Sequence, residues 1–445
     1  MSLLLSLEVE EDIVKGGCMT GFFRSACDFF LEKRIVLAGF LEKALVLNIC
    51  SFVLFSPFSA VFSKISFFWS SLFWISLNIV QYRSKFYRYL IPSTTLNKSL
   101  AVFLAVALAS VLFSVDPYHS QKIFFQRYLF YVIFFWITYG VTSRSRQNFL
   151  YLTFSILALA TIVGAGGLFD HFRLAPERLF SVFGQQINLA VYLCFLFPFS
   201  LVVFLNQEKK FFKLWGLVNI VLLYPVLVFH ASRTVWIVII PVALLICFLK
   251  DRRSFFFFLA VVIATPAFMS SLQKERAKTV LDVFPALASY ESQGTADQPA
   301  VHPRIESLHQ RIDLANSAFA MFKKQPLLGA GPGMFEKLHK PGPGCDPHIH
   351  THVIYLEILS EMGLAGLLAF FMIITMFLKK FFNDFLSWLR KGSLEYSIFA
   401  GLGSAIFIVL LCNLGISSIL VGFQDAAMFW LFMAMGINEK VLGRE

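Results

Sequence analysis

The sequence predicts an all-α polytopic membrane protein, built as a bundle of about twelve transmembrane helices with one large outer loop. Three observations predict this class. Of the 445 residues, 58% are hydrophobic and only 15% are charged, and the mean hydropathy is +0.71. A soluble protein carries roughly 25% charged residues. The long apolar runs between the charged residues are typical of proteins that span a lipid bilayer.

The apolar runs divide the chain into four parts. We expect a cytoplasmic extension over residues 1–43, nine spans within 44–272, a polar loop over 273–351, and three spans with a short cytoplasmic tail over 352–445. Only Lys64 divides the first two spans, and Pro57 could kink a helix there. The expected spans are 44–63, 65–82, 99–115, 123–141, 149–168, 187–205, 214–231, 234–249, 254–272, 352–378, 395–412 and 417–436.

Basic residues are distributed unequally between alternate loops, which predicts the orientation. Clusters at residues 83–88, 209–213 and 250–253 fall on one side. The short loops of the other side hold only scattered basic residues, namely Lys64, Lys122, Arg127, Arg173, Arg178 and Arg233. We therefore expect the first side and both termini in the cytoplasm, and residues 273–351 outside. The net charge of +11 is then explained by loops at an anionic membrane surface, so we expect no nucleic-acid partner.

The long outer segment contains one helical pattern. From Arg304 to Lys324 apolar residues recur at helical spacing, and Pro326 ends the pattern. We expect an amphipathic helix that lies against the membrane surface or over the bundle. Its apolar residues are Ile312, Ala315, Ala318, Phe319 and Phe322.

Two arginines on the outer side are candidate anion ligands. Arg233 follows Ser232 between two apolar spans, where a charge is costly, and Arg311 lies on the expected loop helix. A guanidinium matches the geometry of phosphate oxygens. The alternative is a snorkelling arginine at one position and a solvated one at the other.

Histidines gather where the outer segment meets the span 352–378. His348, His350 and His352 could bind a metal ion, or one of them could act as a general base. Glu357 and Glu361 lie one and two turns deeper, where carboxylates are functional candidates. They could orient His352 or a neighbouring arginine.

Two further segments have polar or glycine-rich patterns at the outer side. Residues 327–335 contain three glycines at alternate positions, which indicates a tight turn and not a phosphate-binding loop, because no Lys-Ser/Thr follows. Residues 183–190 begin another span, and the amides of Gln185 and Gln186 could hydrogen-bond sugar hydroxyls or simply start a helix.

Taken together, these segments resemble the O-antigen ligase and polymerase family from about residue 99 onward. The family consists of membrane glycosyltransferases of the C-type architecture. Val353 stands where the family usually has Asn. The matching segments are Ser110 to Asp116, Phe183 to Ala190, Ser232-Arg233, Arg311 with Pro326 to Gly331, and His350 to Leu364.

The resemblance implies that a glycan linked to undecaprenyl diphosphate is transferred to an acceptor hydroxyl on the periplasmic face of a bacterial inner membrane. It implies His352 as the base, with His350 second, and Arg233, Arg311 and Arg178 as ligands of the diphosphate. It implies no metal ion or cofactor, and direct attack predicts inversion at the anomeric carbon. The expected substrate contacts are Gln185, Gln186, Tyr355 and Glu361.

Several functions share these motifs. The leading interpretation is ligation of O-antigen to lipid A-core, and the alternatives are a polymerase that joins glycan repeats and a protein-glycosylating relative. A different class is a transporter of a small anion such as bicarbonate. The polar candidates collect at the outer boundary and not at the middle of the bilayer, which favours an enzyme.

Overall fold

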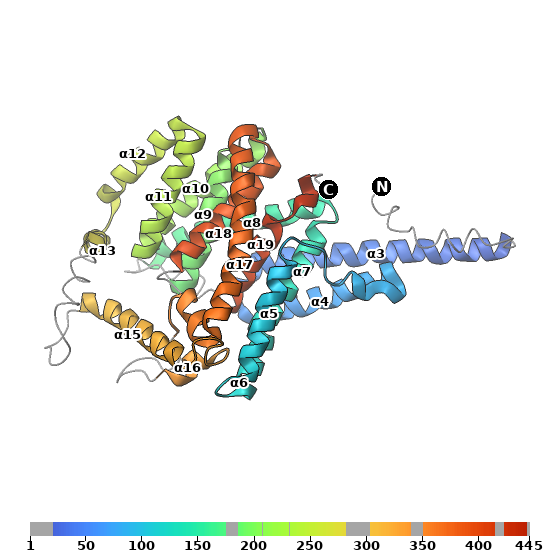
Figure 1. Ribbon diagram of the computed structural model, residues 1–445. Helices are drawn as coiled ribbons and strands as arrows, with labels where there is room; N and C mark the ends of the chain where they lie inside the picture. Colours follow the sequence, from blue (N-terminus) through green and yellow to red (C-terminus); the bar gives the residue numbers. More distant parts are fainter. Residues whose placement is uncertain are drawn as a thin grey trace.

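The computed structural model describes residues 21–174, 186–206, 208–230, 232–281, 303–339, 350–413 and 422–442 (Figure 1). The described residues form helices and turns, with no strand among them, so the all-α prediction is confirmed. The elements are α3 (Gly21–Phe55), α4 (Ala60–Tyr82), the 3₁₀ segment η1 (Arg83–Arg88), α5 (Asn97–Leu112), α6 (Pro117–Ile123), the π-helical segment η2 (Phe124–Leu129), α7 (Phe130–Thr142), α8 (Arg146–Leu174), α9 (Gln186–Phe204), α10 (Lys210–His230), α11 (Arg233–Lys250), α12 (Arg252–Phe268), α13 (Ser271–Leu281), α15 (Pro303–Lys324), α16 (Met334–Leu338), α17 (Ile354–Lys391), α18 (Leu394–Cys412), α19 (Phe423–Gly436) and η4 (Glu439–Leu442).

The chain is a multi-pass membrane protein. Within the described ranges, eight helices are long and apolar enough to cross a membrane, and two shorter apolar helices accompany them at Asn97–Leu112 and Leu189–Phe204. The expected number of about twelve spans stays a prediction, because α12 and α19 have only 17 and 14 residues.

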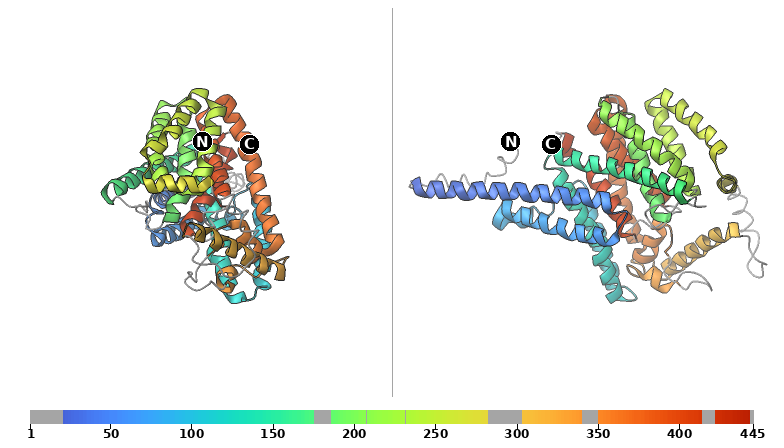
Figure 2. Two further views of the ribbon diagram at one scale, coloured as in Figure 1. Left: turned by 90° about the vertical axis from the view of Figure 1, so that its left-hand side faces the viewer. Right: turned by 180° about the vertical axis from the view of Figure 1, so that it is seen from behind.

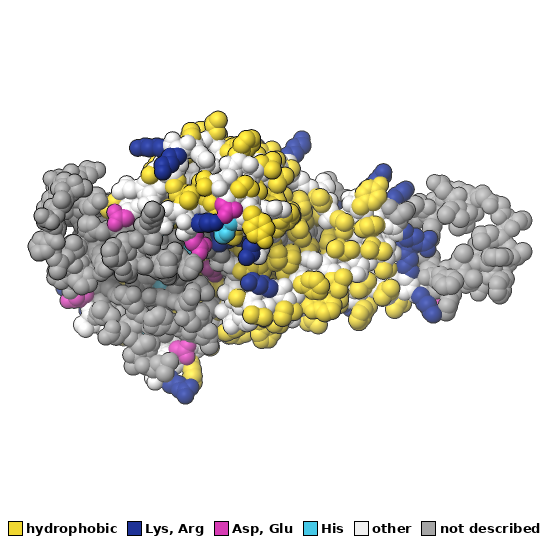
Figure 3. Space-filling model, turned by 90° about the horizontal axis from the view of Figure 1, so that it is seen from below, with side chains coloured by type: hydrophobic (Ala, Val, Ile, Leu, Met, Phe, Trp, Pro, Cys, Tyr) yellow, Lys and Arg dark blue, Asp and Glu magenta, His cyan; other side chains and the backbone are white. Residues whose placement is uncertain are grey.

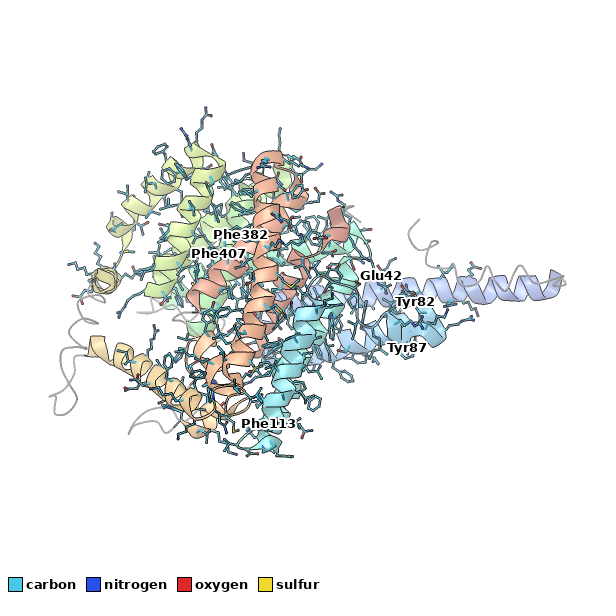
Figure 4. All side chains as sticks on the ribbon, viewed as in Figure 1. Glu42, Tyr82, Tyr87, Phe113, Phe382 and Phe407 are labelled. Carbon is cyan, nitrogen blue, oxygen red and sulfur yellow. The ribbon has the colours of Figure 1, made fainter. Side chains whose placement is uncertain are left out.

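The centre of the bundle is formed by α9 and α18. These helices pack along each other and are buried over most of their length, and α17, α19 and α10 pack around them. Phe382 of α17 and Phe407 of α18 meet edge to face at 6.2 Å (Figure 4). Figure 1 shows α10, α11 and α12 on one side of these central helices and α5 on the other.

The first two helices project from the bundle. α3 and α4 run side by side across the direction of α17, as two views show (Figures 1 and 2). The predicted break at Lys64 is wrong, since Lys64 lies inside α4 and the turn lies at residues 56–59. Ser59 caps α4 by accepting a hydrogen bond from the Phe62 N–H at 3.1 Å. Residues 21–43, predicted as part of an extension, belong to α3.

The projecting pair has an apolar surface and a basic end. Seen from below, apolar side chains cover much of this part, and lysines and arginines gather toward its tip (Figure 3). The segment η1 supplies Arg83, Lys85 and Arg88 after α4. On the inner part of the pair, the Arg144 guanidinium lies 4.0 Å from the Glu42 carboxylate, which Figure 4 labels.

The loop helix α15 lies over the bundle, as one of the two predicted placements had it, and packs on α17. The predicted apolar face is partly wrong. Leu314 and Ala318 are the buried residues and pack with Phe335, whereas Phe319 is 46% exposed. The inward face is therefore rotated from the predicted one, because α15 packs on α17 and on Phe335 of α16.

Candidate active site

The first turns of α17 form a separate short helix. Gly363 interrupts α17 with a φ of 65° and a ψ of −164°, so residues 354–362 and 364–391 are two helices joined by a kink. Only glycine adopts this backbone conformation without strain. We call residues 354–362 the half-helix, and its N-cap residue Val353 directly follows His352.

The kink leaves backbone groups without helical partners, and the segment before α16 satisfies them. The N–H groups of Ala330 and Gly331 donate to the carbonyl oxygens of Ser360 and Glu361 at 3.0 and 2.9 Å. In return, the N–H groups of Leu364 and Ala365 donate to the carbonyl oxygens of Pro326 and Leu327 at 2.9 and 3.1 Å. Buried backbone groups are almost always paired. This exchange therefore fixes the end of the half-helix to residues 326–331.

The three glycines of this segment are required by close packing. A Cβ on Gly329 would lie 2.3 Å from the Glu361 carbonyl carbon, and one on Gly331 would lie 2.1 Å from Ser114 Oγ. Both have positive φ, at 68° and 111°. The interpretation of residues 327–335 as a tight turn is confirmed, and its position explains why the turn must be so tight.

The end of α5 forms the other wall of this turn. Ser110 Oγ donates to the Glu361 carbonyl oxygen at 2.8 Å, and Ser114 Oγ donates to the Ala330 carbonyl oxygen at 3.1 Å. Phe113, at the end of α5, marks this region in Figure 4. The two serines belong to the segment Ser110 to Asp116, which resembles the family. Their hydroxyl groups bind backbone carbonyl oxygens and hold the glycine turn against the half-helix.

Asp116 joins the same assembly from the start of α6. Its carboxylate accepts a hydrogen bond from the His119 N–H at 3.1 Å and pairs with Lys337 of α16. The hydrogen bond from Lys337, followed by that from the His119 backbone, lowers the pKa of Asp116. This ion pair joins the start of α6 to α16 beside the glycine turn.

His352 precedes the half-helix in a strained conformation. Its φ is 55°, and one other non-glycine residue among those described has a positive φ. The Thr351 hydroxyl accepts a hydrogen bond from the Val353 N–H at 3.3 Å and donates to the Val353 carbonyl oxygen at 2.8 Å. Strain of this kind collects at functional sites. His350 and His352 are both half-buried.

Arg233 and Arg311 are brought together from distant parts of the chain. Arg233 is the first residue of α11, after the N-cap Ser232, and Arg311 lies on α15. Surrounding protein atoms, and after them the like charge of Arg233, lower the pKa of Arg311. Two guanidiniums that interact electrostatically beside a helix N-terminus are suited to binding an anion.

The loop helix carries Arg311 toward the half-helix. Three residues after Arg311, Leu314 packs against Phe335, and the half-buried Leu356 of the half-helix joins the same cluster. His339 stacks on Phe335 with ring centroids 5.4 Å apart, and burial lowers the pKa of His339, while Asp313 of α15 opposes that shift. The arginine and histidine candidates are thereby carried by elements that pack on each other.

Charged side chains are buried between the half-helix and η2. The Arg127 guanidinium of η2 lies 4.0 Å from the Glu357 carboxylate and interacts electrostatically with Glu361 as well. Glu357 and Glu361 are each 2% exposed. Glu361 Oε1 accepts a hydrogen bond from the Phe335 N–H at 3.2 Å.

The other predicted residues fall into two groups. Tyr355 donates its hydroxyl hydrogen to the Leu410 carbonyl oxygen at 3.1 Å, so both it and Glu361 hold elements together. Their predicted contact with substrate stays a prediction. Arg178, Gln185 and His348 lie outside the described residues, and Gln186 is described only as the first residue of α9. Among described residues, no group of three His, Cys, Asp or Glu side chains could hold a metal ion.

A family model matches the part of the chain that contains these residues. Residues 218–371 match the model of the O-antigen ligase. This part of the chain is therefore similar to the O-antigen ligase family. The O-antigen ligase match begins within α10, ends in α17, and includes Arg233, Arg311 and His352. No curated protein matches the chain closely enough to count as a relative.

Sequence reasoning missed one residue outside the matched segment. Arg127 was counted only as a scattered charge of the outer side, although it lies within the apolar run Pro117–Thr142. A charged residue inside such a run is the signal that could have found it.

Proposed function

We propose that the protein is an O-antigen ligase that transfers a glycan from undecaprenyl diphosphate to lipid A-core at the periplasmic face of the inner membrane. A glycosyltransferase role of the O-antigen ligase and polymerase family is supported by the family match. The observation that carries the proposal is the electrostatic interaction between Arg311 on α15 and Arg233 at the start of α11. Two like charges that interact in this way suit an anion with two negative charges, such as a diphosphate.

In the proposed reaction, an acceptor hydroxyl attacks the anomeric carbon of the lipid-linked glycan. The new bond joins the hydroxyl oxygen to that carbon, the bond from the carbon to the phosphate oxygen breaks, and undecaprenyl diphosphate leaves with the electron pair. His352 accepts the hydroxyl proton, with His350 as the second candidate. Arg233, Arg311 and Arg178 stabilise the charge that develops on the diphosphate. The attack inverts the anomeric carbon and needs no metal ion.

Glu361 and Tyr355 have a different role in this proposal. Their buried contacts with backbone support the shape of the half-helix, so we assign them to positioning and not to direct glycan contact. Gln185 and Gln186 remain the proposed glycan contacts.

The test begins with deletion of the gene in its host and electrophoresis of the lipopolysaccharide. Loss of a ligase leaves bare core while lipid-linked glycan accumulates, whereas loss of a polymerase leaves core that carries a single repeat. An unchanged ladder contradicts both. Complementation with Arg233→Ala, Arg311→Ala or His352→Ala should fail, and Lys324→Ala at the exposed end of α15 should restore the ladder.

A further inference from the structure

Arg127 lies in an irregular part of its helix. The segment η2 (Phe124–Leu129) is π-helical between α6 and α7, so one extra residue is accommodated there. Such π-segments are rare and are frequently found at functional sites. Arg127 occurs in this segment with 17% of its side chain exposed, although the run around it is apolar.

The partners of Arg127 belong to the half-helix that follows His352. Glu357 and Glu361 are four residues apart, so both carboxyl groups lie on the same face of that helix. Arg127 interacts with both, and with Glu357 at 4.0 Å. A buried charge without an opposite charge is strongly unfavourable. The arginine therefore holds this face of the half-helix against η2.

The contact with Glu357 is made one turn from His352. The Glu357 N–H donates to the Val353 carbonyl oxygen at 3.1 Å, and Val353 is the N-cap residue next to His352. The other end of the half-helix is fixed separately, by the glycine turn at Ser360 and Glu361. Movement of the Glu357 side chain would therefore shift the beginning of the half-helix, which sets where the imidazole lies.

We infer that Arg127 is a positioning residue for the transfer reaction, which acts through Glu357 to set the position of His352. The inference rests on the proposed function. It assigns no contact between Arg127 and the diphosphate, because the guanidinium is directed to the buried carboxylates of the half-helix.

The experiment compares purified full-length protein in lipid nanodiscs. The variants are Arg127→Met, Arg127→Lys, Glu357→Gln and the double variant Arg127→Met with Glu357→Gln. Transfer is measured from an undecaprenyl-diphosphate-linked glycan to lipid A-core, as kcat and as KM for the donor, per folded molecule. Arg146→Met is the matched control, because that exposed arginine pairs with Glu395 on another helix.

We expect kcat of Arg127→Met to fall about 10- to 100-fold with the donor KM changed by less than about threefold, since a displacement of ~1 Å can cost on the order of 100-fold in rate. Arg127→Lys should fall between Arg127→Met and the unchanged protein, because it keeps the charge without the planar group. Glu357→Gln should resemble Arg127→Met, and the double variant should be no worse than either single variant, as expected for two residues that act as one unit.

Two results would overturn the inference. An unchanged kcat per folded molecule would mean that Arg127 serves folding alone. A raised donor KM with unchanged kcat would mean that Arg127 binds the donor itself. If Arg127→Met does not fold, the double variant decides, because Glu357→Gln removes the carboxylate that lies 4.0 Å from the missing guanidinium.

Failure of the proposed function gives a different pattern. In that case the unchanged protein shows no transfer. Hydrogen exchange then tests the positioning inference independently, since Arg127→Met should increase exchange of the amides at residues 350–358 and leave those of α15 from Arg311 onward unchanged. Equal exchange in both proteins would overturn the inference without regard to activity.

Discussion

Arg311 of α15 lies near Arg233 at the start of α11, although the two helices are separated in the chain by α12 and α13. Both the surrounding protein and the like charge of Arg233 lower the pKa of Arg311. An anion bound by both guanidiniums would offset their repulsion. We therefore expect the pair to favour a doubly charged ligand.

The first prediction concerns Arg311→Gln. Transfer should fall about 100-fold or more, because loss of one donor to developing charge costs on the order of 100- to 1000-fold in rate. Thermal stability without donor should not fall, since the substitution removes like-charge repulsion. Steady-state kinetics and thermal unfolding in detergent measure the two effects. A less stable protein with normal transfer by its folded fraction would show that Arg311 is structural.

The second prediction concerns the glycine turn. Gly331→Ala should destabilise the protein by about 2 kcal/mol or more, because the added Cβ would lie 2.1 Å from Ser114 Oγ and the φ is 111°. Transfer should be lost with stability. The control is Gly39→Ala in α3, where an added Cβ has no atom within 4 Å. Thermal unfolding of both variants checks this, and equal unfolding temperatures would contradict the packing argument.

The third prediction concerns pH. Burial lowers the pKa of His339, so folding favours its neutral form. A depressed folded-state pKa gives a stability contribution that is complete above the unfolded pKa of about 6.5 and is lost as the pH falls through the folded pKa. Thermal unfolding temperatures at pH 7.5 and 5.5 should therefore differ less in His339→Phe than in the unchanged protein. An identical difference in both proteins would refute this role of His339.

The fourth prediction separates two roles of Tyr355. Tyr355→Phe removes the hydrogen bond to the Leu410 carbonyl oxygen, at an expected cost of about 0.5–1.5 kcal/mol in stability. If the hydroxyl only joins α17 to α18, the KM values for donor and acceptor stay unchanged. A raised KM with normal stability would instead support the direct substrate contact that the sequence suggested.

The helical bundle could be predicted because each long apolar run, and the polar residues that end it, can be recognised from neighbouring residues in the sequence. The division at Lys64 was wrong because the apolar run continues past residues 56–59 and Lys64 lies inside α4, whereas Pro57, noted as a possible kink, lies in the observed turn. The inward face of α15 was misjudged because the choice between Leu314 and Phe319 depends on what the helix packs against, and the sequence alone does not state that.

The sequence predicted most residues of the candidate site, but not which of them interact with each other. Arg233 and Arg311 were chosen separately, and only the fold brings them together. Ser110 and Ser114 were noted as part of a segment, but their role depends on backbone oxygens more than two hundred residues away in the chain. Arg127 was overlooked because its partners Glu357 and Glu361 belong to a distant helix.

The interruption of α17 at Gly363 separates the position of the half-helix from that of the longer helix after it. Inserting a residue after the kink would turn the rest of the helix by about 100° around its axis, since an α-helix has 3.6 residues per turn. The hydrogen bonds of residues 326–331 would still hold the preceding turns in place. Such a change in the part of α17 after Gly363 would therefore leave the backbone before the kink, and with it His352, in place.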